Sequence, residues 1–206
     1  MPKITAVKPQ KRPGFYNVFI NGKFAFSLDN FSRLKYRLLE GKELSEGEIS
    51  QIKKEIGSQK NLDDVLRFLS FRPRSKVETQ RYLEKRKVDK EEVEKILQRL
   101  EGQNLLNDKE FANWWLEQRQ TFRPKSLRLI KNELLKKGIN KEVLTNLKGR
   151  DEGDQAYGIL KKKWPALIRL GVKAARQKAT GFLLRRGYNW EITRKTIDRL
   201  AQEELK

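Results

Sequence analysis

The sequence predicts a mainly α-helical protein of tandem three-helix repeats, preceded by a small N-terminal module of a β-hairpin and a helix pair. A repeated segment supports this prediction, because Leu134–Asn140 reads LLKKGIN, Leu183–Asn189 reads LLRRGYN, and Leu83–Asp89 reads LEKRKVD as a diverged copy. Upstream, Phe71–Pro73 reads FRP and recurs one repeat later as Phe122–Pro124. Repeats of about fifty residues are typical of stacked helical units. We therefore expect an elongated, curved array that binds a long partner along its surface.

The first sixty residues predict a different local structure from the repeats. Ile4–Lys8 and Tyr16–Leu28 have β-like patterns, and Asn21-Gly22 inside the second favours a two-residue hairpin turn, in which both residues need positive φ. A helix is expected from about Asn30 to Glu40, where Gly41 should stop it. These elements form the hairpin and the first helix of the predicted N-terminal module.

A capping pattern and a polar segment set the first domain boundary. Ser45, with Glu48 three residues later, predicts a capping box and a second helix. Gly57–Asn61 is polar and contains glycine, so we expect a linker there. The predicted division of the chain is residues 1–60 for the N-terminal module, 61–110 for repeat one, 111–150 for repeat two and 151–206 for repeat three.

Prolines and serines predict where one helix of a repeat gives way to the next. Pro73 and Pro124 should each end a helix, because proline lacks the backbone N–H that a helix interior needs. Ser75 and Ser126 follow and should cap the next helix, and Glu78 would complete a capping box with Ser75. Repeats one and two therefore share the same predicted turn between their first two helices.

Composition indicates a polyanionic partner and excludes several kinds of chemistry. The 206 residues carry 47 Lys and Arg against 27 Asp and Glu, a formal charge of +20, and contain neither Cys nor His. Without these two residue types, a disulfide, a thiolate nucleophile or a Cys or His metal site cannot form, so we expect no enzyme activity, metal or cofactor. No apolar run approaches the ~18 residues of a membrane span, and the N-terminus lacks the apolar core of a signal peptide. We therefore expect a cytoplasmic protein that contacts nucleic acid and no membrane.

The positive charge is concentrated in the last two repeats. Residues 61–110 carry 12 Lys and Arg against 11 acidic residues, whereas 111–150 carry 10 against 3 and 151–206 carry 13 against 7. Cations near a helix C-terminus also complement the helix dipole, but their recurrence along corresponding helices favours a binding face. We call this set the basic strip and predict that it binds nucleic acid or a nucleoprotein filament: Lys125, Arg128, Lys131, Lys136, Lys137, Lys161, Lys162, Lys163, Arg169, Lys173, Arg176, Lys178, Arg185 and Arg186.

Clustered carboxylates raise the alternative of a Mg²⁺-dependent nuclease. The clusters are Asp63-Asp64, Glu91-Glu92 and Asp151–Asp154. Each lies at a predicted helix start, where the positive end of the helix dipole favours acids. Asp108 has the same interpretation. We therefore expect no catalytic residue and no metal ligand among them.

The aromatic stripe of Phe111, Trp114 and Trp115 has two interpretations. Aromatic side chains can stack on unpaired bases in single-stranded nucleic acid. Aromatics with this helical spacing normally pack inward, however, so we expect core positions, with one of the two tryptophans partly exposed at a junction between repeats.

Three motifs resemble those of the RecX family. Arg72–Glu78 reads RPRSKVE, Leu106–Ala112 reads LNDKEFA and Lys136–Ile139 reads KKGI, which are similar to the family's helix start, its Asp-rich segment and its helix end. The resemblance covers residues 62–204, and the hairpin module resembles an N-terminal extension found in some members. Asn107 stands where the family usually has Asp, and Asn caps a helix equally well.

The resemblance implies a regulator of the RecA recombinase. Such a protein would bind within the helical groove of the RecA filament on DNA and restrain its growth, ATP turnover, strand exchange and co-protease activity. We expect a monomer that also binds single- and double-stranded DNA without sequence preference. The alternative is a stand-alone basic DNA-binding or architectural protein. The sequence leaves open the mode of inhibition, the share of cations that contact DNA rather than RecA, and the role of the N-terminal module.

Overall fold

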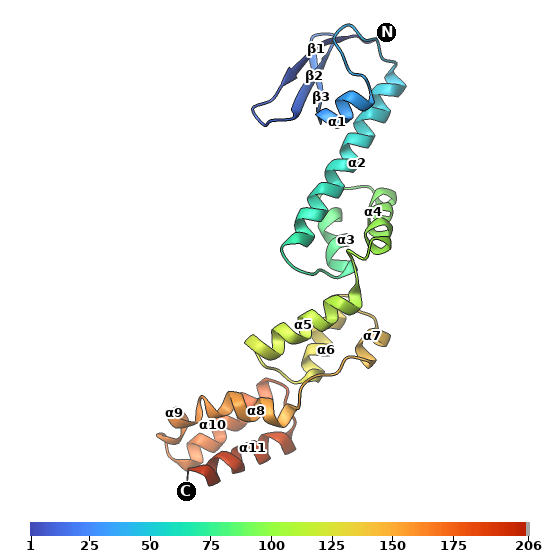
Figure 1. Ribbon diagram of the computed structural model, residues 1–206. Helices are drawn as coiled ribbons and strands as arrows, with labels where there is room; N and C mark the ends of the chain where they lie inside the picture. Colours follow the sequence, from blue (N-terminus) through green and yellow to red (C-terminus); the bar gives the residue numbers. More distant parts are fainter. Residues whose placement is uncertain (205–206) are drawn as a thin grey trace. The chain divides into compact units, whose positions relative to one another are not determined.

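The computed structural model describes residues 1–204 and divides into two compact units. Unit 1 is Met1–Phe68, and unit 2 begins at Leu69. Figure 1 shows a small sheet with helices in unit 1 and helices alone in the described part of unit 2. The predicted fold class, mainly helical with repeated three-helix segments, is confirmed.

Unit 1 contains a three-stranded antiparallel sheet in the order β1-β2-β3. The strands are β1 (Ile4–Pro9), β2 (Phe15–Ile20) and β3 (Lys23–Asp29). The predicted hairpin joins β2 to β3, and its turn places Asn21 at φ 49° and Gly22 at φ 78°, as the Asn-Gly pair requires. The first β-like segment pairs with β2, so the hairpin predicted from the sequence becomes a three-stranded sheet.

One face of this sheet is buried against the helices of unit 1. The row Val7, Val18 and Phe26 runs across the three strands, and Val18 is fully buried. Removal of these side chains from water drives the packing. The core residues are Ile4, Val18, Phe26, Leu28, Leu38, Leu44, Ile49 and Ile52.

Helix α1 (Asn30–Lys35) ends earlier than the predicted Glu40. Asp29 caps its first turn by accepting a 2.7 Å hydrogen bond from the Ser32 N–H. Arg37 then adopts φ 50°, which reverses the chain direction and brings Leu38 into the core with no exposed surface. Burial of Leu38 thus outweighs continuation of the helix.

Helix α2 (Glu46–Ser70) begins with the predicted capping box. The Ser45 N–H donates to the Glu48 carboxylate at 2.7 Å, and the Glu48 N–H donates to the Ser45 hydroxyl at 3.2 Å. The predicted linker at Gly57–Asn61 is wrong, because α2 is continuous through it. A single glycine costs a helix only about 1 kcal/mol, and the buried Ile52, Leu62 and Val65 stabilise the helix on either side. The boundary between residues 60 and 61 remains a prediction that falls inside this helix.

Unit 2 contains the remaining helices of the three repeats. Two of them belong to repeat one, three to repeat two and four to repeat three, where the short α9 begins at Trp164-Pro165. The helices are α3 (Lys76–Lys85), α4 (Lys90–Gly102), α5 (Asp108–Phe122), α6 (Leu127–Lys136), α7 (Lys141–Thr145), α8 (Glu152–Lys161), α9 (Trp164–Ile168), α10 (Val172–Arg185) and α11 (Trp190–Glu203).

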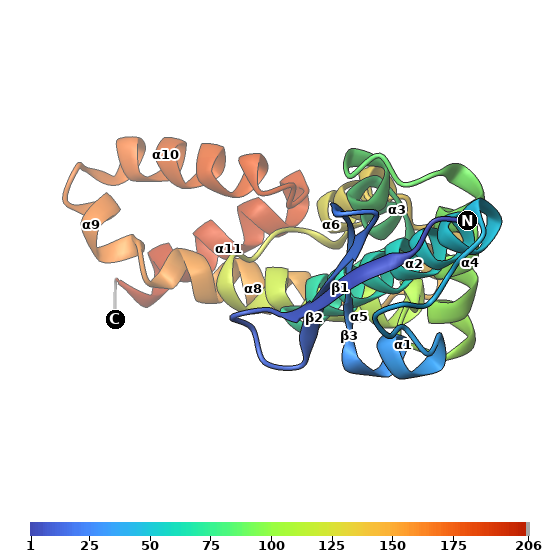
Figure 2. The same cartoon turned by 90° about the horizontal axis from the view of Figure 1, so that it is seen from above.

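Repeats two and three each have their own apolar core. Figure 2 shows α8, α10 and α11 as one bundle, which buries Trp164 and Tyr188. In repeat two, Phe111 is fully buried, with Ile130 and Leu134 of α6. The predicted core position of the aromatic stripe is therefore confirmed for Phe111, while Trp114 and Trp115 pack on it and stay partly exposed.

Candidate functional site

The predicted serine caps lie at contacts between successive repeats. Ser75 caps α3 by accepting from the Glu78 N–H at 3.1 Å, and its hydroxyl donates to the Lys137 carbonyl oxygen at 2.8 Å. One residue further, the Lys76 N–H donates to the Asp108 carboxylate at 2.9 Å. These bonds connect the start of α3 to the end of α6 and the start of α5, and we call this contact the first joint.

The second joint repeats the first at equivalent positions. The Ser126 N–H donates to the Arg186 carbonyl oxygen at 2.9 Å, and the Leu127 N–H donates to the Glu152 carboxylate at 2.7 Å. Ser126 is the counterpart of Ser75, and Glu152 is the first residue of α8 as Asp108 is of α5. Residues at equivalent positions therefore join repeat one to repeat two and repeat two to repeat three, although the serine donates through its hydroxyl in the first joint and through its backbone N–H in the second.

Both joints require glycine in the turn that follows the middle helix. Gly138 and Gly187 have φ values of 84° and 86°, where side chains with a Cβ are disfavoured. A Cβ on Gly138 would lie 2.2 Å from Val77 Cγ2, and one on Gly187 would lie 2.5 Å from Leu129 Cγ. The repeated Lys-Lys-Gly and Arg-Arg-Gly segments are thus explained first by packing between repeats.

An ion-pair network reinforces the first joint. The Glu78 carboxylate accepts from Arg72 at 3.1 Å and from Lys137, instead of folding back to complete the predicted capping box. Burial alone would raise the pKa of Glu78, but the hydrogen bonds from Lys137 and Arg72 hold it below its ordinary value. Asp108 differs, because burial raises its pKa and the bond from the Lys76 N–H only partly opposes this.

Several members of the basic strip are engaged in internal contacts. Lys137 and Arg186 contribute backbone atoms to the joints, and Lys125 precedes α6 and pairs with Glu133 at 2.5 Å. The spacing of the basic strip predicted that Lys125 lies on the same helix as Arg128 and Lys131. This is wrong for Lys125, because α6 begins only at Leu127. Arg176 pairs with Asp198 at 2.7 Å, so its charge is also partly compensated.

The remaining residues of the basic strip differ in how far their side chains are exposed to solvent. Lys131 is half-buried, and the aromatic ring of Phe182 lies 5.3 Å from the Lys163 ammonium. Lys161 donates to the Tyr157 hydroxyl at 3.0 Å. Among residues 1–204, the exposed members of the strip that form no ion pair are Arg128, Lys136, Lys161, Lys162, Lys163, Arg169, Lys173, Lys178 and Arg185. Their binding role stays a prediction, and these nine carry it.

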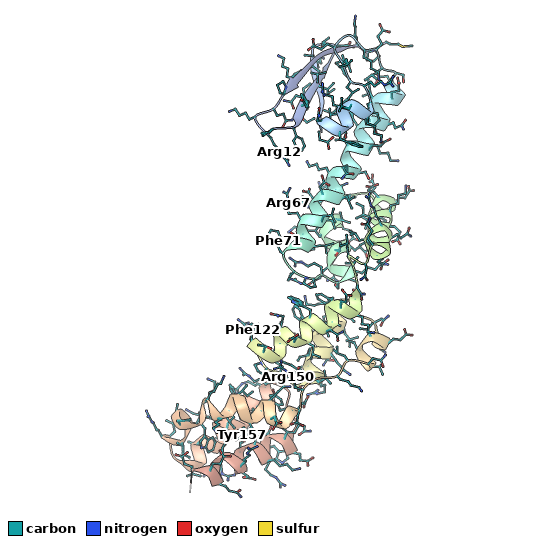
Figure 3. All side chains as sticks on the ribbon, viewed as in Figure 1. Arg12, Arg67, Phe71, Phe122, Arg150 and Tyr157 are labelled. Atoms are coloured by element: carbon teal, nitrogen blue, oxygen red, sulfur yellow. The ribbon has the colours of Figure 1, made fainter. Side chains whose placement is uncertain are left out.

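Two exposed phenylalanines lie in the repeated Phe-Arg-Pro turns, and nothing in the sequence indicated their exposure. Phe71 and Phe122 occupy the same position in the repeated Phe-Arg-Pro turns, and their side chains are 77% and 73% exposed. Figure 3 shows both on the same edge of unit 2. Leu170 and Val172 flank the corresponding turn of repeat three and are also exposed. Because they recur at matched positions, these exposed apolar groups are the candidate contact residues of unit 2.

Comparison with known proteins identifies the family. Family models match four consecutive segments: a regulatory protein RecX N-terminal domain at residues 2–45, and the first, second and third RecX three-helix domains at 62–100, 107–146 and 151–197. The chain belongs to the RecX family. Its members are regulatory proteins and not enzymes, as the sequence predicted.

Relatives and solved structures agree with this assignment. Regulatory protein RecX of Listeria welshimeri is 30% identical over 197 residues, with 93% of this chain and 73% of the relative covered. That of Lactobacillus gasseri is 29% identical, with 99% and 77% covered. A crystal structure of regulatory protein RecX superimposes with a TM-score of 0.66 at 25% identity, covering 96% of this chain and all of the other. RecX from Lactobacillus salivarius shares the fold, with a TM-score of 0.61 at 20% identity over 70% and 97% of the two chains.

The acidic clusters of this chain lie within or at the start of helices. Asp151 caps α8 by accepting from the Asp154 N–H at 2.8 Å, and Glu91-Glu92 lies in the first turn of α4. Asp63-Asp64 does not begin a helix as predicted, because α2 continues through it, and Asp63 accepts from the Gln59 side chain. Within residues 1–204, no group of three or more acidic side chains is placed to hold a metal ion, and no helix is long and apolar enough to cross a membrane.

Proposed function

We propose that this RecX-family chain regulates the RecA recombinase by binding the RecA filament on DNA, within its helical groove. Binding there would restrain filament growth, ATP turnover, strand exchange and co-protease activity. Family membership supports a regulatory role. The observation that carries the proposal is the repetition of an exposed phenylalanine at matched turns of unit 2.

A filament presents the same surface once per subunit, so a repeated contact suits it. Phe71 and Phe122 would each insert into an apolar site on RecA, and the first joint would hold their spacing. Linked weak contacts gain affinity because the second one forms at high effective concentration. Arg123, exposed beside Phe122, adds a cation that can pair with a carboxylate at the edge of such a site.

The exposed cations of the basic strip would act on the DNA inside the filament. Their binding to phosphates needs no base sequence, because the attraction depends on charge and counterion release. The single- and double-stranded DNA binding expected from the sequence belongs to this part of the proposal.

The test is the DNA-dependent ATPase of RecA on a long single strand, with the chain present at well below one copy per RecA subunit. We expect inhibition at these amounts, and the Phe71→Ala/Phe122→Ala double variant should need a roughly tenfold higher concentration, the loss typical of exposed aromatic anchors. Phe31→Ala is the matched control, since Phe31 is 75% exposed and lies in unit 1. Equal inhibition by the double variant and the wild type would remove these residues from the contact.

The stand-alone DNA-binding alternative predicts a different stoichiometry. A protein that only coats DNA inhibits when its amount matches the length of DNA, whatever the amount of RecA. If inhibition follows the DNA concentration in this way, the RecA-directed proposal is wrong.

A further inference from the structure

The outer face of the unit 1 sheet, opposite its core, carries a cluster of aromatic and cationic side chains. Residues directly opposite each other on neighbouring strands point to the same face. Ala6, Phe19 and Phe24 form one such row, and Lys8, Asn17 and Ser27 form another. Both rows alternate with the buried row through Val18, so they lie on the face away from the core.

The phenylalanine rings on this face are accessible and arranged for stacking. Phe24 is 59% exposed, and its ring meets Phe19 edge-on at a centroid distance of 6.0 Å. Phe15 lies further along β2 on the same face, opposite Asp29, with the Arg12 guanidinium 3.9 Å from its ring centroid. The core cluster of unit 1 is built from other residues. Exposed aromatic rings cost solvation free energy unless a partner covers them.

The charged side chains of the first 28 residues, which include β1 and β2, are all positive. Residues 1–28 contain five Lys and Arg and neither Asp nor Glu. The Lys8 ammonium lies 5.5 Å from the Phe19 ring, so cations and aromatic rings are interleaved. This combination fits a polyanion that also offers flat apolar surfaces, which describes nucleic acid with unpaired bases.

Polar side chains between the aromatic rows complete the surface. The Asn17 side-chain oxygen accepts from Gln10 at 2.7 Å and from Ser27 at 2.6 Å. An open groove of about 660 Å³ begins beside this network, lined by Gln10, Phe24 and Ser27 and continued by α2. Asp63 and Asp64 line its α2 side. Phosphates would therefore follow the cationic β1–β2 side, away from these carboxylates.

We propose that this outer face binds single-stranded DNA, with bases stacked on Phe24, Phe19 and Phe15 and phosphates held by Lys8 and Arg12. A duplex cannot use the rings, because its bases are already stacked inside the helix. The proposal gives the N-terminal module a role of its own, separate from the basic strip of repeats two and three. It does not depend on RecA.

The test measures binding of the full-length chain to a fluorescent oligothymidylate and to a duplex of equal length, without RecA. Phe24→Ala should weaken single-strand binding by about tenfold, within the range for loss of one stacked base, and leave duplex binding unchanged. Phe24→Tyr should bind like the wild type, because the ring is retained. Phe31→Ala, which removes a still more exposed ring of the same unit, should change neither affinity.

A second background prevents the basic strip from masking the effect. The same variants are measured in a chain with Arg128, Arg169, Lys173 and Lys178 changed to Glu, where the contribution of unit 1 should become larger. If Phe24→Ala in this background binds the single strand as tightly as the same chain with Phe24 intact, the proposal is wrong. An equal loss on single strand and duplex would also overturn it, because it would indicate a charge or folding effect.

Discussion

The Ser75 hydroxyl donates a 2.8 Å hydrogen bond to the carbonyl oxygen of Lys137, so the cap of one repeat is completed by the helix end of the next. Ser75 is fully buried, and a buried hydroxyl without a partner would be costly. At the corresponding position, Ser126 contacts the Arg186 carbonyl oxygen through its backbone N–H rather than its hydroxyl. Local helix signals and the contact between repeats therefore use the same few residues, which explains why the Ser and Lys-Lys-Gly motifs recur together.

The first prediction tests the glycine of the first joint. Gly138→Ala should lower the free energy of unfolding by about 2 kcal/mol or more, because alanine at φ 84° is strained and its Cβ would overlap Val77. Urea denaturation followed by circular dichroism measures the change. Gly158→Ala is the control, since Gly158 lies in α8 with open space around its Cβ position, and the same substitution there should stabilise by roughly 0.5–1 kcal/mol. A loss at both positions would contradict the packing explanation.

The second prediction concerns the diverged copy in repeat one. Lys87 stands where the other repeats have glycine and adopts φ 60°. Lys87→Gly should therefore raise the free energy of unfolding by about 1 kcal/mol, since glycine relieves the left-handed strain. Lys85→Gly, within the last turn of α3, should instead destabilise by up to about 1 kcal/mol. If Lys87→Gly also destabilises, the Lys87 side chain contributes a contact that outweighs the strain.

The third prediction uses the lowered pKa of Glu78. An acid whose pKa is lower in the folded than in the unfolded state stabilises the fold above its unfolded pKa, and this stabilisation is lost as pH falls through the folded pKa. Glu78→Gln should cost about 1–2 kcal/mol at pH 7, because it leaves Arg72 and Lys137 without their carboxylate. The difference from the wild type should shrink as the pH falls below the ordinary value of 4.5.

Urea midpoints of both proteins between pH 7 and pH 3 measure this effect. Glu191→Gln is the control, because the hydrogen bond from Lys195 lowers the pKa of Glu191 in an exposed ion pair, where solvent screening leaves little effect on stability at any pH. A difference that stays constant across the pH range would mean that Glu78 acts through packing rather than charge.

Local signals in the sequence predicted much of the fold. The caps at Ser45, Ser75 and Ser126 and the turn at Asn21-Gly22 were confirmed, since each depends on residues a few positions apart. The linker at Gly57–Asn61 was wrong, because a polar segment with one glycine has weak preferences that neighbouring buried residues override.

The candidate site was harder to predict than the fold, because its contacts cross repeats. Glu78 was expected to bond its own helix start, yet it pairs with Lys137, which is 59 residues away in the chain. Lys125 is likewise compensated by Glu133 across a turn. Charge spacing identifies candidate cations, but only the packed structure separates those that are already paired from those that are exposed.

The last prediction locates the DNA contact within unit 2. Two sets of four exposed cations are compared, one from the basic strip and one from repeat one. Changing either set to Glu alters the net charge by the same amount. Both sets should leave the helical spectrum nearly unchanged, because exposed charges contribute little to stability. The strip set is Arg128, Arg169, Lys173 and Lys178, and the control set is Lys85, Lys90, Lys95 and Arg99.

Reversal of the strip set should weaken single-strand binding strongly and lower the slope of log affinity against log salt by roughly 3, since each lost phosphate contact removes about 0.7. The control set should change affinity modestly and leave the slope close to that of the wild type, because the loss of net charge acts at a distance and is screened by salt. Fluorescence anisotropy between 50 and 200 mM salt measures both quantities. If reversal of the control set reduces the slope and reversal of the strip set does not, the nearly neutral first repeat holds the principal DNA contact. The prediction that the basic strip binds DNA is then wrong.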